Sequence, residues 1–501
     1  MPPRNLNVIL IAGIIAAFCY AAYRRARTAM MVGDALEMIN SYYVDPVEDQ
    51  DLLTAAMNGM TASLDEHSSY IPGDAYETFQ NSINQEFAGI GIYVEQPDPE
   101  QPVRVITPLV GSPALREGIL PDDRIITVDG EDVSRMELRD VSDRLKGPVG
   151  TNVKVGVRRA GDKEVTVTVQ RETIQLESVI GDHRDEGNDW VYRLQSDPMV
   201  AYIRVTSFGE KTVDEVRGIL QDLNNDFKAL IFDLRGNSGG LLYAARDISD
   251  MFLDKGRIVS TRVRGNVIDE VYDASAGTLV NQAKPVAVLI DGDSASASEI
   301  VAACLQDSGR ATIVGTRSYG KGTVQNILPL QYGRSALRLT VARYYRPSDK
   351  NIHRKPDATE DDIWGVTPDE GCVVQLDEET VVALNQHWRE ASYPMLVKAD
   401  DEDADANDSD PQADDESTDA ASGTDSVEEP VDEDQASEDQ ASEDQPSEDQ
   451  ASEDQPSEDQ PSEDPATLPL QDDDPLDYDP QLKRAYDRLM DQLARAPSVA
   501  A

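Results

Sequence analysis

The sequence predicts a multidomain protein in which a small β-rich domain is followed by an α/β domain, with helical segments near both ends. Short β-branched runs alternate with helical patterns between residues 199 and 346, which is typical of an α/β domain. Before them, residues 87–171 hold short apolar runs broken by turn residues, as in a β-rich domain. A chain of 501 residues is long enough for about two to four domains.

The first 27 residues are expected to be a membrane anchor or a signal segment. Arg4 precedes an apolar run, Val8–Ala22, of about 15 residues, which is short for a membrane span and typical of a signal peptide. No A-x-A cleavage site follows, so we favour an uncleaved anchor, with transmembrane insertion as a helix, over a cleaved signal or a buried soluble helix. The arginines at 24, 25 and 27, which follow the apolar run, would by themselves favour a topology that keeps the rest of the protein in the cytoplasm.

Residues 28–82 form a helical N-terminal region in which Leu36, Ile39 and Tyr43 recur at helical spacing. Residues 83–172 then contain five strand-like runs and one helix, Met136–Leu145. That content fits a small β-barrel-like domain.

Residues 173–398 make up the α/β domain, with a mostly parallel and buried sheet. Its expected strands are 199–208, 229–236, 286–292, 311–316 and 335–346. Its expected helices are 213–225, 241–253 and 297–306.

The acidity of the chain is concentrated near its end. The segment Asp400–Asp479 holds 34 acidic residues and no Lys or Arg. The net charge of the whole chain is −50, so the rest of the chain carries −16. The low-complexity segment 399–475 has too little apolar surface to offset its ordering entropy, and we expect a disordered acidic insert. Residues 476–501 then give a terminal helix, whose apolar stripe should dock on the folded body: Leu482, Ala485, Tyr486, Leu489 and Leu493.

Composition also excludes some classes of function. The chain has no cluster of Lys and Arg that could neutralise phosphates, so nucleic-acid binding is excluded. Three widely spaced cysteines give neither a disulfide framework nor a metal motif, and we expect no metal and no cofactor.

Three short motifs at strand ends could carry chemistry. Residues 293–300 (DSASASEI) place serines at a strand-to-helix junction, where an Oγ can project beside free backbone N–H groups. Residues 317–322 place Lys321 between two glycines, and a lysine can act as a base only when desolvation lowers its pKa. Residues 233–241 (DLRGNSGGL) hold paired glycines that leave N–H groups free. Taken singly, these motifs also suit a helix cap, a solvated loop lysine and a tight βα turn.

Together, the order and spacing of these motifs resemble the C-terminal processing peptidases, also called tail-specific proteases. The family pattern is DLR-x-N-x-GG, then SASE after a strand, then GKG-x-x-Q. The likeness extends to LD-x-HS at 64–68, F-x-GIGI at 87–92, GVTPD at 365–369 and DPQL at 479–482. Only the N-terminal apolar segment and the acidic run lie outside it.

The resemblance implies a Ser–Lys catalytic dyad. Carried over by motif, Ser296 is the nucleophile, Lys321 is the general base and Gln325 orients the lysine. Ser298 is the runner-up for the nucleophile. The N–H groups of Ala297 and of Gly239 or Gly240 would form the oxyanion hole, and Glu299 would position the helix or the substrate.

A histidine-dependent or metal-dependent mechanism is disfavoured. None of the four histidines lies beside a GxSxG motif or in an HExxH spacing: His67, His183, His353 and His387. His67 is expected to be structural.

The resemblance also makes residues 83–172 a PDZ domain and residues 173–398 a catalytic domain of the crotonase-like kind. Gly89, Ile90, Gly91 and Ile92 would then bind a peptide carboxylate while the peptide adds as a strand. One departure is the segment 120–123 (LPDD), where the family usually has a glycine before the last aspartate.

The expected function is that of a serine endopeptidase, which cleaves proteins at or near free C-termini that the PDZ domain captures. The body would lie in the cell envelope, on the non-cytoplasmic side. The alternatives are a membrane-tethered PDZ scaffold with an inactive protease domain, and a hydrolase that acts on non-peptide substrates.

Overall fold

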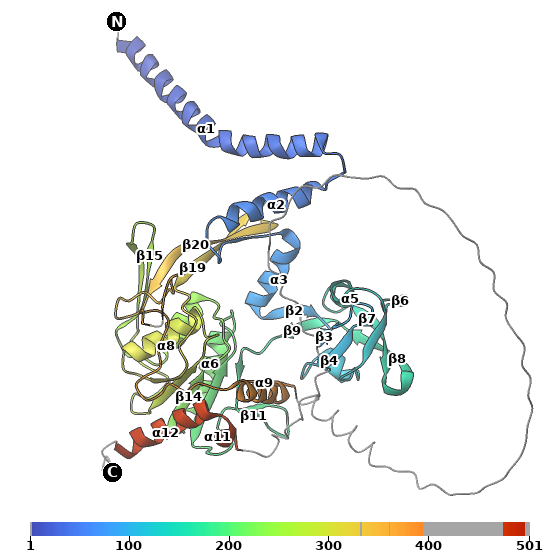
Figure 1. Ribbon diagram of the computed structural model, residues 1–501, viewed down its shortest axis with the longest axis vertical. Coiled ribbons are helices and arrows are strands. Elements are labelled where there is room, and N and C mark those ends of the chain that lie inside the picture. The colour runs from blue at the N-terminus through green and yellow to red at the C-terminus, as the bar shows by residue number, and fades with distance from the viewer. Residues whose placement is uncertain (1–2, 331–332, 360, 394–473, 496–501) are drawn as a thin grey trace, which may run out of the picture. The chain divides into compact units, whose positions relative to one another are not determined.

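The computed structural model of the chain describes residues 3–330, 333–359, 361–393 and 474–495 (Figure 1). The expected disordered acidic segment, 399–475, lies almost entirely outside the described residues.

The N-terminal region is helical, as the sequence predicts. It contains α1 (Pro3–Tyr42), α2 (Asp49–Ala62) and α3 (Gly73–Asn84), with the short strand β1 (Ser69–Ile71) between the last two. The expected transmembrane helix over residues 1–27 is not found, since no helix in the described part of the chain combines the length and apolarity that a membrane span requires.

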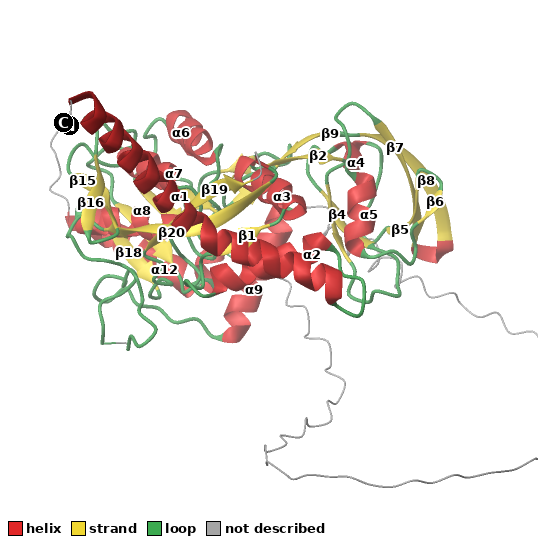
Figure 2. Cartoon of the chain, turned by 90° about the horizontal axis from the view of Figure 1, so that it is seen from above, coloured by secondary structure: helices red, strands yellow, loops and turns green. Residues whose placement is uncertain are grey.

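The β-rich domain is built on an antiparallel sheet of order β3-β4-β5-β7-β8, with β6 beside β5. Figure 2 shows its strands β4 to β8 in yellow. Its strands are β3 (Ile92–Glu95), β4 (Arg104–Pro108), β5 (Arg124–Val128), β6 (Glu131–Asp132), β7 (Asn152–Arg159) and β8 (Lys163–Gln170). Its short helices are α4 (Pro113–Arg116), α5 (Leu138–Leu145) and the 3₁₀ turn η1 (Ala160–Asp162). Val153, Val155 and Val157 alternate along β7 into the core, fully buried, as period-2 patterning requires. Outside this sheet, β2 (Glu86–Gly89) pairs with β9 (Glu172–Gln175).

The turn at 120–123 keeps its backbone conformation without a glycine. Asp122 has a φ of 62°, in the left-handed region where glycine is favoured and aspartate is tolerated. The Asp122 carboxylate accepts a 2.8 Å hydrogen bond from Arg104, and the Asp122 N–H donates to the Val105 carbonyl at 2.8 Å. Side-chain and backbone hydrogen bonds therefore hold a conformation that a glycine would adopt at less cost.

The α/β domain contains a sheet of order β10-β13-β14-β17-β18, in which all pairs except β10–β13 are parallel. Its strands are β10 (Val179–Ile180), β13 (Val200–Val205), β14 (Ala229–Asp233), β17 (Val286–Ile290) and β18 (Thr312–Gly315). The central strands are buried on both faces, as their unbroken apolar runs predict.

Helices cover the two faces of this parallel sheet. One face packs with α6 (Thr212–Leu223), α7 (Leu242–Asp250) and α8 (Ala297–Asp307). The other face packs with the C-terminal helix α12 (Pro480–Arg495), which follows α11 (Pro475–Tyr478) and is drawn in red in Figure 1. Leu482, Ala485 and Leu489 of α12 are buried against it.

A second, antiparallel sheet has the order β1-β20-β15-β16, with β19 paired to β20. Its strands are β15 (Arg257–Val263), β16 (Val267–Asp273), β19 (Thr323–Leu330) and β20 (Ser335–Tyr345). The sequence places 335–346 among the strands of the mostly parallel sheet, and this is wrong. The short connection between β19 and β20 cannot hold a crossover, so the two strands pair antiparallel.

The remaining elements are a small β-ribbon and one helix. The ribbon pairs β11 (His183–Arg184) with β12 (Trp190–Val191), and the helix α9 (Glu378–Ser392) ends next to the residues outside the described part.

Candidate active site

Two loops meet at the carboxyl edge of the parallel sheet, where open α/β sheets place their ligand sites. One follows β14 (residues 234–241) and the other follows β17 (residues 291–296). The Ser294 hydroxyl donates to the Leu234 carbonyl at 2.9 Å, and the Ala295 N–H donates to the Asn237 carbonyl at 3.0 Å. The DLRGN motif and the serine motif are therefore bonded into one structure.

Of the three serines in the second loop, Ser296 is the one whose hydroxyl donates to no carbonyl group; its oxygen faces the Glu299 N–H in a capping box. Ser294 and Ser298 are fully buried, and the Ser298 hydroxyl donates to the Asn237 carbonyl at 2.8 Å. Ser296 is partly exposed and has φ 55° and ψ −111°, an unusual conformation for a residue other than glycine. Its side chain stands at the sharp turn into α8.

Backbone donors surround this serine. A Cβ on Gly239 would lie 2.8 Å from Ser296 Cβ and 3.0 Å from the Ala297 nitrogen, so only glycine permits this approach. The Gly239 N–H is already used, because it donates to Asn237 Oδ1 at 2.8 Å. Within the described residues, the N–H groups of Ala297 and Gly240 have no protein acceptor. Of the two predicted glycine candidates, Gly240 is thus the one with a free donor.

Lys321 follows β18 in a loop that packs closely on His353 and Arg354. A Cβ on Gly322 would lie 2.4 Å from the His353 nitrogen, and one on Gly320 would lie 2.8 Å from Arg354 Cβ. Burial lowers the pKa of Lys321, and the positive charge of Arg338 lowers it further, while Glu299 and Glu66 oppose the shift. In the described conformation no hydrogen bond joins Lys321 Nζ to Ser296 Oγ.

Glu299 ties the serine loop to the lysine loop. Its carboxylate is fully buried and accepts from the Ser296 N–H at 2.8 Å and from the Lys321 N–H at 2.8 Å. It also accepts from the Gly320 N–H at 2.7 Å and the Ser318 hydroxyl at 2.6 Å. Burial raises the pKa of Glu299, and these four donors oppose the rise. The side chain fixes both loops, a more specific position than the helix or substrate contact predicted for it.

Gln325 lies on β19, two residues beyond the first residue of the strand. Its amide nitrogen donates to the hydroxyls of Thr323 at 2.9 Å and Thr340 at 3.1 Å. Thr340 in turn donates to Asp65 Oδ1 at 3.1 Å. This chain of bonds connects the LD-x-HS segment to the predicted orienting residue, whose amide oxygen is left available to accept a hydrogen bond.

His67 lies closer to the site than the sequence suggests. Burial lowers its pKa, and the next contribution is the positive charge of Lys321. Its Nε2 is 3.4 Å from Glu66 Oε1. His67, Glu66 and Arg338 therefore form part of the electrostatic environment of the lysine, and no local motif of the sequence indicates this.

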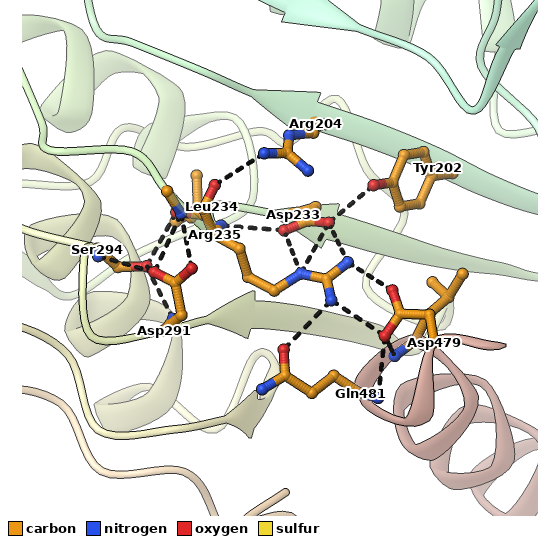
Figure 3. A network of polar contacts seen from close by, with 11 residues as sticks. Tyr202, Arg204, Asp233, Leu234, Arg235, Asp291, Ser294, Asp479 and Gln481 are labelled. Carbon is orange, nitrogen blue, oxygen red and sulfur yellow. Dashed lines mark hydrogen bonds and ion pairs between the residues drawn. The ribbon is translucent and has the colours of Figure 1, made fainter. Parts of the chain in front are cut away.

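A buried ion-pair network connects the first residues of the 234–241 loop to the start of α12 (Figure 3). Arg235 is 2.6 Å from an Asp233 oxygen and 2.9 Å from an Asp479 oxygen, and all three side chains are at most 3% exposed. Gln481 accepts from Arg235 at 3.2 Å. Burial alone would raise the pKa of Asp233, but Arg235 and Arg204 hold it below its ordinary value. The start of α12 is thereby bonded to the residue that precedes the glycine-rich loop.

The predicted carboxylate-binding loop of the β-rich domain lies between β2 and β3. The carbonyl groups of Ile90 and Gly91 accept from Ala114 at 2.9 Å and Leu109 at 3.0 Å, respectively. Gly91 has a φ of 77°, and a Cβ there would lie 2.5 Å from Ser112 Cβ. In the described part of the chain the N–H groups of Ile90 and Gly91 have no acceptor, and β3 is an edge strand that can pair with a peptide.

Comparison with known proteins matches two family models, the one described as Peptidase family S41 to residues 199–371 and the one described as PDZ domain to residues 78–158. A carboxy-terminal-processing protease of Bartonella bacilliformis is 39% identical over 67% of this chain and 73% of its own length. A carboxyl-terminal-processing protease of Synechocystis is 31% identical over 66% of this chain and 73% of its own length. A solved structure of a photosystem II D1 C-terminal processing protease is 26% identical, covers 70% of this chain and 93% of that chain, and has a TM-score of 0.38.

Proposed function

The chain belongs to peptidase family S41 and is a carboxy-terminal-processing serine protease with a PDZ domain, and we propose that Ser296 and Lys321 carry its reaction. The observation that carries this assignment is the hydroxyl of Ser296, which donates to no carbonyl and lies at a strained turn between two buried serines that do. Glu299 supports it, because one carboxylate bonds the backbone of both proposed residues.

The proposed chemistry begins with neutral Lys321. Lys321 Nζ takes the hydroxyl proton of Ser296 while Ser296 Oγ forms a bond to the carbonyl carbon of the substrate. The negative charge that develops on the carbonyl oxygen is stabilised by the N–H groups of Ala297 and Gly240. The Lys321 ammonium then protonates the leaving amine as the C–N bond breaks, and water hydrolyses the acyl ester by the same route.

Gln325 and burial prepare the lysine for this role. The amide of Gln325 is fixed by Thr323 and Thr340, so that its oxygen can accept a hydrogen bond from Lys321. Burial and Arg338 lower the pKa of Lys321, which increases the fraction of neutral amine at a given pH.

The test of the nucleophile is covalent labelling. A fluorophosphonate probe should modify one residue, and peptide mapping by mass spectrometry should place the label on Ser296. Label on Ser298 would move the nucleophile to the runner-up. An unlabelled, folded protein without peptidase activity would favour the alternative of a PDZ scaffold with an inactive protease domain.

For the PDZ domain, we propose that the residues 89–92 capture the C-terminus of a protein substrate. The free N–H groups of Ile90 and Gly91 suit a carboxylate, and the edge strand β3 suits an added peptide strand. A peptide with an amidated C-terminus should bind the domain far more weakly than the same peptide with a free carboxylate. Equal binding would contradict this role.

We also propose that the chain acts in the cell envelope, with the catalytic body on the non-cytoplasmic side, and that its N-terminal segment associates with the membrane. The apolar run Val8–Ala22 and the family resemblance support this location. A reporter fused after Leu396 should be active outside the cytoplasm, and activity confined to the cytoplasm would reverse the proposal. We further propose that the domains span the residue ranges expected from the sequence and that the catalytic domain is of the crotonase-like class.

A further inference from the structure

Tyr344 of β20 is a fully buried phenol whose hydroxyl has no partner. It is 1% exposed and ranks among the largest fully buried side chains of the described residues. Within those residues, no hydrogen bond of ordinary geometry reaches its Oη, although the Ser296 hydroxyl lies near enough to affect its pKa. An unsatisfied buried hydroxyl costs about 1–3 kcal/mol, so its presence calls for an explanation.

The surroundings of Tyr344 are those of the proposed active site. Its N–H donates to the carbonyl of Gly322 at 3.2 Å, next to Lys321. Its side chain belongs to the same core cluster as Ala297 and Ile300, in the first turn of α8. Burial raises the pKa of Tyr344 well above its ordinary value, the Glu299 carboxylate raises it further, and the Ser296 hydroxyl opposes the rise. The phenol thus stays protonated and remains a hydrogen-bond donor.

Packing alone does not explain a tyrosine here. The same cluster uses phenylalanine at Phe208, Phe232 and Phe252, where a ring suffices. Tyr202 is also fully buried in the catalytic domain, but its hydroxyl donates to Asp233 Oδ2 at 2.7 Å. A phenylalanine at 344 would fill the same space without leaving a buried hydroxyl unpaired.

We propose that Tyr344 is a positioning residue for the nucleophile, whose Oη donates a hydrogen bond to Ser296 Oγ when the serine hydroxyl turns its proton toward Lys321. This inference rests on the proposed role of Ser296. The serine oxygen has one proton and two lone pairs, so a donor on one lone pair limits the directions in which the proton can point. As the proton leaves for Lys321, charge grows on Oγ and the bond from the phenol strengthens.

The experiment replaces Tyr344 by phenylalanine, which removes only the hydroxyl. We expect kcat on an unstructured protein substrate to fall roughly ten- to a hundredfold, the contribution of a hydrogen bond to a group that becomes charged. KM should stay within about twofold and the melting temperature should not fall, because an unsatisfied buried hydroxyl is lost. The rate of fluorophosphonate labelling should drop in parallel with kcat.

Tyr345→Phe is the matched control, with the same chemical change one residue further on. Its hydroxyl bonds Asn266 at the surface, at 3.3 Å, so kcat and melting temperature should stay at the values of the unmodified enzyme. Tyr344→Phe with unchanged kcat would overturn the inference, and so would a loss of kcat accompanied by a large fall in melting temperature. The proposed function fails separately, if Ser296→Ala retains activity.

Discussion

Asp479 should contribute strongly to stability, although it lies in the last described segment of the chain. Its carboxylate lies against Arg235 in the buried network and also accepts from the N–H groups of Gln481 and Leu482, both at 3.0 Å, as the N-cap of α12. Asp479→Ala removes the ion pair and the cap together, whereas Asp479→Asn keeps an oxygen for the cap and removes the charge.

The expected cost follows from these contacts. Breaking a buried ion pair by removing one partner costs about 3–5 kcal/mol, and the remaining pair of Arg235 with Asp233 puts this site near the lower end. Loss of an N-cap adds about 1 kcal/mol. Asp479→Ala should therefore destabilise by about 4 kcal/mol, and Asp479→Asn by about 3 kcal/mol. At about 2–4 °C per kcal/mol, the melting temperature falls by roughly 10 °C for the alanine variant.

Thermal melts of the purified protein, followed by circular dichroism, measure this. Asp487→Ala is the control: Asp487 forms an exposed pair with Lys483, four residues earlier on the same helix, and should change stability by less than about 0.5 kcal/mol. If Asp479→Ala melts within 2 °C or so of Asp487→Ala, the network does not hold α12 as argued.

Two further predictions concern the pH profile and the acidic segment. Neutral Lys321 is the active form, so kcat/KM should rise with pH through the pKa of Lys321. In initial-rate profiles on a fluorogenic peptide, Arg338→Gln should move this rise to higher pH and Glu66→Gln should move it to lower pH. Shifts of both variants in the same direction would contradict the charge assignments. Replacing residues 400–472 by a short Gly/Ser linker should leave melting temperature and activity nearly unchanged, because that segment has few apolar residues to bury. Deleting residues 476–501 should destabilise the protein, because it uncovers the sheet face under Leu482 and Leu489. The reverse result in thermal melts would refute this account of the C-terminus.

Much of the fold could be predicted because its patterns are local. Period-2 alternation along 151–159 predicts β7, and the unbroken apolar runs predict the buried strands β14 and β17. The apolar stripe of 482–493 predicts a helix, and α12 packs that stripe on the sheet. The antiparallel pairing of β20 depends on partners far along the chain, including β1, and no local pattern encodes it.

The polar contacts of the site could be predicted only in part. Short motifs identify Ser296, Lys321 and Gln325 by resemblance, and these assignments stay predictions. The four donors to Glu299 come from two loops that the fold brings together, so their convergence is invisible in the sequence. The same holds for the bond from Thr340 to Asp65, which joins residues 275 positions apart.

The most direct test of the Ser–Lys mechanism is the activity of Lys321 variants that fold. Lys321→Ala and Lys321→Arg should both melt near the temperature of the unmodified enzyme and both fail to cleave an unfolded protein, because alanine has no base and a guanidinium stays protonated. Ser296→Ala serves as the reference for an enzyme without a nucleophile. The account predicts that all three are equally inactive, and substantial cleavage by a folded Lys321→Ala protein would contradict it.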